Sequence, residues 1–132
     1  MRRDDRIELE ERIAERRRRE NAAPRLKMAV SQIGSLSLEI EEYMGDSDTP
    51  RVRYKRHIVV ERAPAIFFIG CTEADCSDGG HDVTVSIMAK LRSSSTDFTG
   101  EDKCYGNRYG KTCGARLKYH GHASYHARDQ AP

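Results

Sequence analysis

Residues 115–126, ARLKYHGHASYH, contain the clearest structural signal in the chain. Apolar or small side chains alternate strictly with basic, polar or histidine side chains along this stretch. Successive side chains of a β-strand point to opposite faces of a sheet, so this period of two predicts a strand. One face of the strand is expected to be packed, and the other to be cationic and rich in histidine.

Residues 51–62 form a second predicted strand. Basic side chains alternate with apolar ones along it, with Arg56 as the exception, so we expect one buried face and one basic face. The expected buried side chains are Val52, Tyr54, Ile58 and Val60, and the expected basic ones are Arg51, Arg53, Lys55 and His57.

The segment between these two strands combines further short strands with one helix. Residues 65–69 are wholly apolar, which predicts a buried strand leading into Gly70 and Cys71. After Asp82, apolar side chains recur at helical spacing as far as Ser93, which predicts an inserted helix. Its inner face is expected to contain Val83, Ile87, Met88 and Leu91.

The first 45 residues favour helices. Residues 4–20 are dominated by charge and predict a charged helix with few apolar side chains. Within residues 24–44 apolar side chains recur at steps of three and four, which predicts a second, amphipathic helix. The alternation of Leu36, Leu38 and Ile40 with polar residues also fits a strand, but the stripe continues on both sides and favours the helix. The face expected to dock on a partner contains Leu26, Val30, Ile33, Leu36 and Ile40.

The acidic residues near residue 44 conflict with this predicted helix. Glu39, Glu41 and Glu42 would lie at its C-terminal end, where the helix dipole disfavours negative charge. A basic surface formed by residues 51–56 would explain them. Residues 46–50 form a cluster of turn residues, which predicts a linker between domains.

Composition limits the class of protein. The chain has 132 residues, of which 37% are hydrophobic and 33% charged, and its formal net charge is +2. Its longest apolar run is far shorter than the ~20 residues of a membrane-spanning helix. Its N-terminus lacks the apolar segment of an export signal, so we expect a cytoplasmic protein without membrane contact.

The four cysteines form two pairs that are far apart in the sequence. Cys71 and Cys76 are separated by four residues, and Cys104 and Cys113 by eight. Two loops that each supply two thiolates can build a tetrahedral zinc site, so we expect one structural Zn²⁺. Two local disulfides or four free thiols remain alternatives, although disulfides are rare in reducing compartments. His81 also remains open as a substitute ligand.

The order strand, cysteine pair, intervening segment, cysteine pair, strand resembles a zinc ribbon over about residues 65–126. The resemblance implies Cys71, Cys76, Cys104 and Cys113 as metal ligands. The spacing within both pairs differs from the usual Cys-x-x-Cys, and the inserted helix is not part of a simple ribbon. The expected fold class is α+β: an N-terminal helical arm or hairpin, residues 1–45, followed by a small zinc-stabilised antiparallel β domain, residues 51–128. Residues 129–132 are expected to form a tail.

The sequence favours a protein without enzymatic activity. Zinc-deaminase, metalloprotease, hydrolase and P-loop motifs are all absent, and four cysteine ligands would leave zinc no open position. His120, His122 and His126 share one face of the predicted strand and could form a second metal site, a pH-sensitive contact, part of a nuclease-like centre or an ordinary solvated face. Few acidic residues lie near them in the sequence, which weakens the idea of a metal-dependent nuclease.

Two functions therefore remain, and neither involves a small-molecule substrate. The first is binding of nucleic acid or a nucleoprotein complex through basic elements. The second is a protein–protein adapter that docks on a partner or on itself through helices 4–20 and 24–44. The expected contact residues are Arg51, Arg53, Lys55, Arg56, Arg108, Lys111, Arg116, Lys118, His120 and His122.

Overall fold

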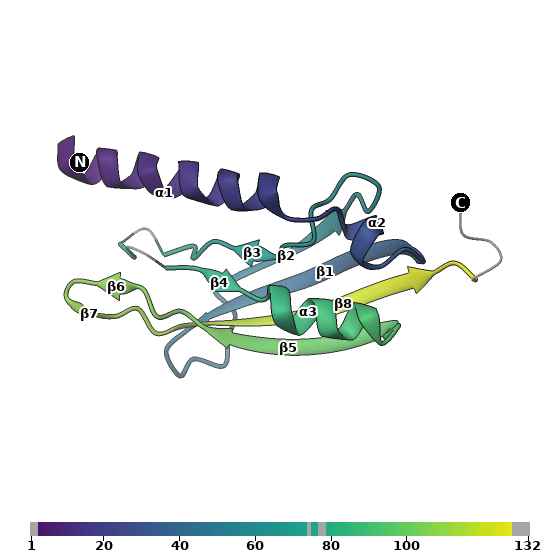
Figure 1. Cartoon of the computed structure of the whole chain (residues 1–132). Coiled ribbons are helices and arrows are strands. Elements are labelled where there is room, and N and C mark those ends of the chain that lie inside the picture. Colours follow the sequence, from purple (N-terminus) through teal and green to yellow (C-terminus); the bar gives the residue numbers. More distant parts are fainter. Residues whose placement is uncertain (1–2, 74, 77–78, 128–132) are drawn as a thin grey trace.

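Strand β8 (Ala115–Tyr125) pairs antiparallel with one strand on each side, as its sequence predicts. It belongs to a four-stranded sheet of order β2–β1–β8–β5 (Figure 1). The other strands are β1 (Ile33–Met44), β2 (Val52–Ile58) and β5 (Asp97–Lys103). The computed structural model describes residues 3–73, 75–76 and 79–127, and only the backbone of residues 3–5, 8, 9 and 108. The predicted tail, residues 129–132, lies outside the described residues.

The remaining elements are short strands and three helices. The strand pair β3 (Phe68–Ile69) and β4 (His81–Asp82) is antiparallel, and so is the hairpin of β6 (Asn107–Arg108) and β7 (Lys111–Thr112). The helices are α1 (Arg3–Ala22), α2 (Leu26–Ala29) and α3 (Thr84–Arg92). The fold is α+β, with an N-terminal helix and an antiparallel sheet. None of the described helices is both long and apolar enough to cross a membrane.

The prediction of a helix over residues 24–44 is wrong. Only Leu26–Ala29 is helical, and Ile33–Met44 is the long strand β1. Leu36, Leu38 and Ile40 are buried while the residues between them are not, which is the period of two that the helical interpretation set aside. Because β1 pairs with β2 on one side and β8 on the other, tertiary pairing determines its conformation.

The predicted docking face is part of the core, which is a second correction. Its residues are at most 9% exposed and pack with side chains from β8, β5 and α3. They cannot form a docking surface without unfolding the sheet. These residues are Leu26, Val30, Ile33, Leu36 and Ile40.

The predicted domain boundary at residues 46–50 is also wrong. These residues form the turn between β1 and β2, which pair directly in one sheet. The acidic residues that conflicted with a helix find their partners across this hairpin, because Glu41 lies opposite Arg53 in the register. The explanation by a basic segment was therefore correct, although the element is a strand.

Among the described elements, helices and a strand pair cover one face of the sheet and none covers the other. The helices and the β3–β4 pair all lie on the same side of the sheet (Figure 1). On that side α3 contributes Ile87, Met88 and Leu91 to the core, as predicted. At the sheet edge, Tyr54 of β2 is 40% exposed, so the expected buried face of that strand is only partly formed.

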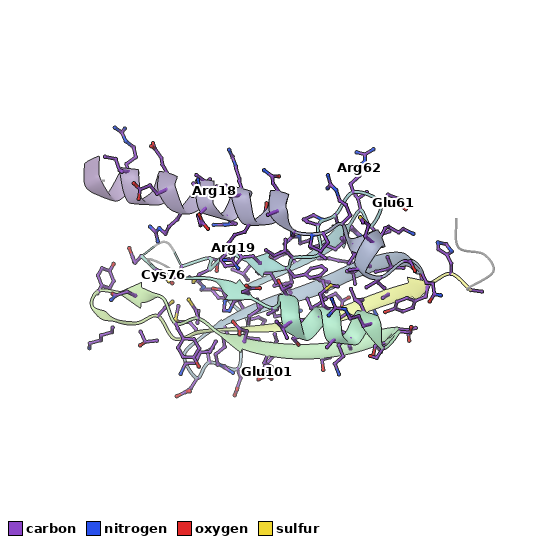
Figure 2. All side chains as sticks on the ribbon, viewed as in Figure 1. Arg18, Arg19, Glu61, Arg62, Cys76 and Glu101 are labelled. Atoms are coloured by element: carbon purple, nitrogen blue, oxygen red, sulfur yellow. The ribbon has the colours of Figure 1, made fainter. Side chains whose placement is uncertain are left out.

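Helix α1 lies on the outer side of the β3–β4 pair (Figure 1). The guanidinium of Arg16 stands 4.6 Å from the centre of the Phe68 ring. Arg19 reaches from the helix toward β4, where its Nη2 lies 3.3 Å from Asp82 Oδ2 (Figure 2). The helix predicted over residues 4–20 is confirmed.

Candidate metal centre

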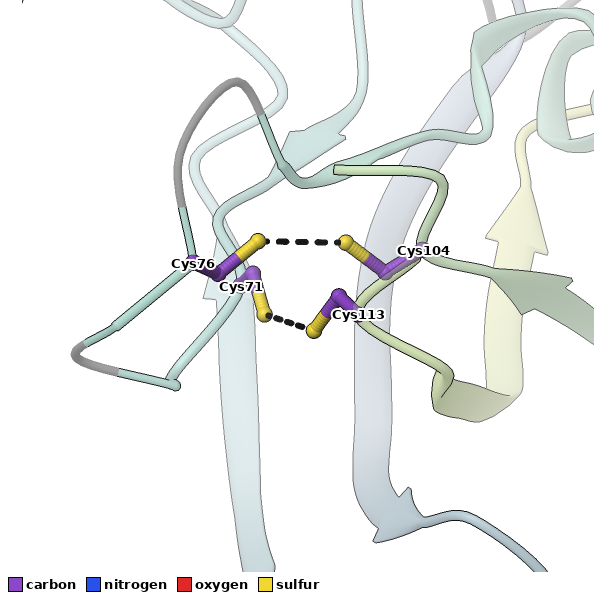
Figure 3. Close-up of side chains that lie close together, drawn as sticks. All are labelled: Cys71, Cys76, Cys104 and Cys113. Atoms are coloured by element: carbon purple, nitrogen blue, oxygen red, sulfur yellow. Dashed lines mark hydrogen bonds between the residues drawn. The ribbon is translucent and has the colours of Figure 1, made fainter. Parts of the chain in front are cut away.

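Four cysteine side chains converge from two loops beside the sheet (Figure 3). Cys71 and Cys76 lie in the connection from β3 to β4, whereas Cys104 follows β5 and Cys113 follows β7. The second loop is held at its base, since the backbone N–H of Cys104 donates to Ala115 and that of Cys113 donates to Gly106. The sequence prediction that these four residues come together is confirmed.

The spacing of the sulfur atoms fits a metal site. The Sγ atoms of Cys71 and Cys113 are 3.8 Å apart, and those of Cys76 and Cys104 are 3.7 Å apart. All four sulfurs lie within 4.8 Å of one another. Four sulfurs at ~2.3 Å from a tetrahedral zinc ion would be separated by about 3.8 Å. None of the four cysteines belongs to a disulfide, so the alternative of two local disulfides is not realised.

Glycines allow the loops to close around the sulfurs. A Cβ at Gly79 would collide with the Sγ atoms of Cys76 and Cys104. Backbone N–H groups also point at the sulfurs: Glu73 donates to Cys71, and Gly80 and Gly106 donate to Cys104. Such donors favour the thiolate form, which is the form that binds a metal.

The environment affects the thiols unequally. Burial raises the pKa of Cys71 well above its usual range and raises the pKa of Cys76 to about 12. Burial also opposes ionisation of Cys104, but the N–H donors of Gly106 and Gly80, together with hydrogen bonds from Cys76 and Cys71, lower the pKa of this thiol. A metal that binds here therefore has to displace protons from the first two cysteines.

A buried carboxylate stands next to the cluster. Glu42 is 1% exposed, and its Oε1 lies 3.8 Å from Cys71 Sγ. It accepts a hydrogen bond from the backbone N–H of Thr72 and lies 3.3 Å from Arg51 Nη2. Arg51 also lies 2.7 Å from Glu73. The sequence analysis did not place Glu42 beside the cysteines. The only signal in the sequence was that Glu42 conflicts with the predicted helix and lies close to the basic residues 51–56.

His81 is not part of the ligand cluster. It is completely buried, and its Nδ1 lies 2.8 Å from Asp102 Oδ2. Its Nε2 has no hydrogen-bond partner among the described residues. Four cysteines within ligand distance leave no need for His81 as a substitute.

The predicted contact residues do not all share one surface. Arg51 donates a hydrogen bond to Glu73 in the cysteine-bearing loop. Arg56 lies on the opposite face of β2 from Arg53 and Lys55. Lys111 is exposed on β7 near the cysteines, while the side chain of Arg108 lies outside the described residues. The residues on the uncovered sheet face are Arg53, Lys55, Arg116, Lys118, His120 and His122.

Positive and negative side chains alternate across this face. Arg53 pairs with Glu41 at 3.0 Å, and Lys118 lies 3.8 Å from Glu101. Arg116 donates to the carbonyls of Gly45 and Ser47. The face is therefore rich in cations, several of which have partners within the sheet.

A cleft of about 490 Å³ lies between α1 and the cysteine-bearing loop. Arg12, Arg16 and Arg19 line one wall, and Phe68, Cys71 and Cys76 are among the residues of the other. The positive charge of the α1 wall is partly neutralised, because Arg19 forms an ion pair with Asp82.

Comparisons with known proteins do not assign a family. The chain matches no protein-family model, no curated protein and no solved structure. The resemblance to a zinc ribbon therefore stays a prediction from the sequence.

Proposed function

We propose that Cys71, Cys76, Cys104 and Cys113 hold one structural Zn²⁺, and that the chain is a nonenzymatic, zinc-stabilised binding protein. The observation that carries the metal assignment is the set of sulfur separations, which matches a tetrahedral tetrathiolate site. Four protein ligands leave zinc no open position for water, which favours a structural role. Cysteines that form no disulfide with one another also suit a reducing compartment such as the cytoplasm.

Metal is expected to add stability to the loops because the strand pairs next to them are short. The β3–β4 and β6–β7 pairs contain two residues in each strand. The cysteines belong to a small cluster that is separate from the main core. Its buried residues are Cys104, Cys113 and Ala115, and Cys71 and Cys76 pack against them. A metal that cross-links two loops would therefore supply much of their stability.

The test is metal content and thermal stability of the reduced protein. We expect one zinc per chain at the cysteines, a lower melting temperature after chelation, and recovery when Zn²⁺ returns. Cys113→Ser should lose this metal, while Lys111→Ala, an exposed change on the same hairpin, should keep it. Equal melting temperatures with and without metal would contradict a structural role.

As the binding target we propose nucleic acid, contacted through the phosphate backbone. The supporting observation is that Arg53 and Lys55 of β2 and Arg116 and Lys118 of β8 stand on one uncovered sheet face. Cations spread over such a face can contact successive phosphates of a nucleic acid. The carboxylates on the same face repel phosphates and so limit the strength of binding.

Fluorescence anisotropy with short DNA and RNA, repeated over a salt series, tests this target. Binding should weaken steeply with salt, and each lost phosphate contact should reduce the salt slope by about 1. Lys55→Ala should weaken binding, whereas Lys90→Ala on α3, on the covered side, should not. Absence of binding at low salt would contradict the nucleic-acid proposal.

A second candidate is a protein partner, specifically a second copy of the chain. The alternation of Arg53 with Glu41 and of Lys118 with Glu101 supports it, because an alternating face can complement itself across a two-fold axis. Sedimentation over a concentration series tests this candidate. Glu41→Gln also distinguishes nucleic-acid binding from self-association. It should strengthen nucleic-acid binding, because it removes a carboxylate that repels phosphate. It should weaken self-association, because it removes a negative charge that would pair with a cation of the second copy.

A further inference from the structure

Two histidines and two carboxylates meet on the uncovered face of the sheet, away from the cysteines. His120 and His122 are two residues apart on β8, so their side chains stand on the same face. Glu39 of β1 lies opposite His120 in the register, and Asp97 of β5 lies opposite His122. The central strand thus carries the two imidazoles, and each neighbouring strand supplies one carboxylate.

The atoms on the Glu39 side have the separations of ligands around one ion. Glu39 Oε2 lies 3.6 Å from His120 Nδ1 and 3.5 Å from His122 Nε2. All three atoms lie within 4.8 Å of one another. Nitrogen and oxygen ligands at ~2.1 Å from a tetrahedral zinc ion would be about 3.4 Å apart. Small side-chain adjustments would therefore bring the three atoms to ligand distance.

Asp97 is placed to orient the imidazole of His120 and lies near that of His122. Its Oδ1 contacts His120 Nε2 and lies 3.7 Å from His122 Nδ1, which are the ring nitrogens that do not face Glu39. A carboxylate that accepts the N–H of one ring nitrogen fixes the tautomer and presents the other nitrogen to a metal. The two rings also lie close together, with centroids 4.2 Å apart.

We propose that Glu39, His120 and His122 form a second metal site, which binds a divalent transition-metal ion such as Zn²⁺, with Asp97 as the positioning residue. Two imidazoles and one carboxylate favour zinc and its neighbours over Mg²⁺ or Ca²⁺, which prefer oxygen ligands. Three protein ligands leave a fourth position for water. The two histidines are 39% and 43% exposed, so an ion can reach the site from solvent.

The sequence analysis grouped His126 with His120 and His122, but in the structure His126 lies apart from this site. His126 follows the end of β8, and its ring lies beside Gly34 at the opposite end of β1 from the cysteine loops. Glu39 and Asp97 are distant from the histidines in the sequence and become their neighbours only through strand pairing. This proposal is independent of the proposed function, because it shares no ligand with the cysteine cluster.

Equilibrium dialysis of the reduced full-length protein against Zn²⁺, followed by metal counting, tests the second site. Wild type should bind one more equivalent than His122→Ala or Glu39→Gln. His57→Ala, on the same face of the edge strand β2, is the matched control and should bind as wild type does. If the cysteines held no zinc, wild type would bind one ion and His122→Ala none, so the difference still reports on this site alone.

A second measurement uses the unaltered chain and does not depend on the folding of a variant. Added Zn²⁺ should shift the ¹⁵N resonances of His120 Nδ1 and His122 Nε2, while those of His57 and His126 stay in place. Asp97→Asn should weaken binding without abolishing it, because Asp97 positions the rings. Equal zinc content of wild type and His122→Ala, or unchanged resonances of His120 and His122 at saturating Zn²⁺, would overturn the proposal.

Discussion

The guanidinium of Arg51 lies against the buried carboxylate of Glu42, with its Nη2 3.3 Å from Glu42 Oε1. The same guanidinium contacts Glu73 and Thr72 in the cysteine-bearing loop. Glu42 in turn lies beside Cys71. The pair therefore links the central strand β1 to the candidate metal centre, and the position of the loop depends on both residues.

Arg51→Ala should destabilise the protein because it leaves Glu42 buried with fewer partners. Loss of a charged hydrogen-bond partner from a buried group costs about 1–3 kcal/mol. Chemical denaturation of the zinc-loaded protein would measure this loss. Arg53→Ala is the matched control: it removes an exposed ion pair two residues further along the chain and should cost about 0–1 kcal/mol. Equal effects of the two substitutions would show that the Arg51–Glu42 pair has no special role.

Gly79→Ala should weaken metal binding at the cysteines. The added Cβ would collide with the Sγ atoms of Cys76 and Cys104, so the loop has to move and the sulfurs separate. Competition with a zinc chelator would detect the lower affinity. Gly70→Ala provides the control in the same loop, because no atom lies within 4 Å of a Cβ at that position. An unchanged affinity in Gly79→Ala would mean that the loop can adapt.

Ile40→Ala should cost about 2–5 kcal/mol of unfolding free energy, as large-to-small changes in a core do. Ile40 is 1% exposed on β1, between β2 and β8. Met28→Ala, at an exposed position of α2, should change stability little. Denaturant unfolding would compare the two variants. A fully stable Ile40→Ala protein would restore the view that this residue faces a partner rather than the core.

The sequence predicted best where a pattern was local and unambiguous. The strict alternation in residues 115–126 gave the central strand with its correct faces, and helical spacing gave α3 with its buried residues. Two close pairs of cysteines predicted one shared tetrathiolate site, and the four side chains do lie together. The inferences about β8 and α3 needed only residues that are neighbours in the sequence, whereas the cysteine site joined two pairs that are far apart.

Prediction failed where distant strands determine the outcome. In β1, spacings of two, three and four coexist, and only pairing with β2 and β8 decides between helix and strand. Pairing of β8 with β1 and with β5 brings Glu39 and Asp97 to His120 and His122, although the sequence near these histidines contains few acids. The partners of Glu42 are likewise visible only after the hairpin has formed.

The ion pair between α1 and β4 should make stability depend on acid pH. Burial by itself would raise the pKa of Asp82, but hydrogen bonds from Thr84 and the charge of Arg19 outweigh it and hold this pKa below its usual value. A native pKa below the unfolded value of ~3.9 means that the carboxylate stabilises the fold above that pH. This contribution should disappear as the pH falls through the native pKa.

Urea unfolding over a series of acidic pH values would measure this dependence. Asp82→Asn should lower stability at neutral pH and converge with wild type in strong acid, because both side chains are then uncharged. Arg19→Gln should move the loss of stability to higher pH, since Asp82 then lacks its cationic partner. Arg18→Gln is the matched control, because Arg18 pairs with Glu15 within α1 and not with β4 (Figure 2). If Arg18→Gln and Arg19→Gln shifted the profile equally, general helix charge rather than the Arg19–Asp82 contact would control Asp82.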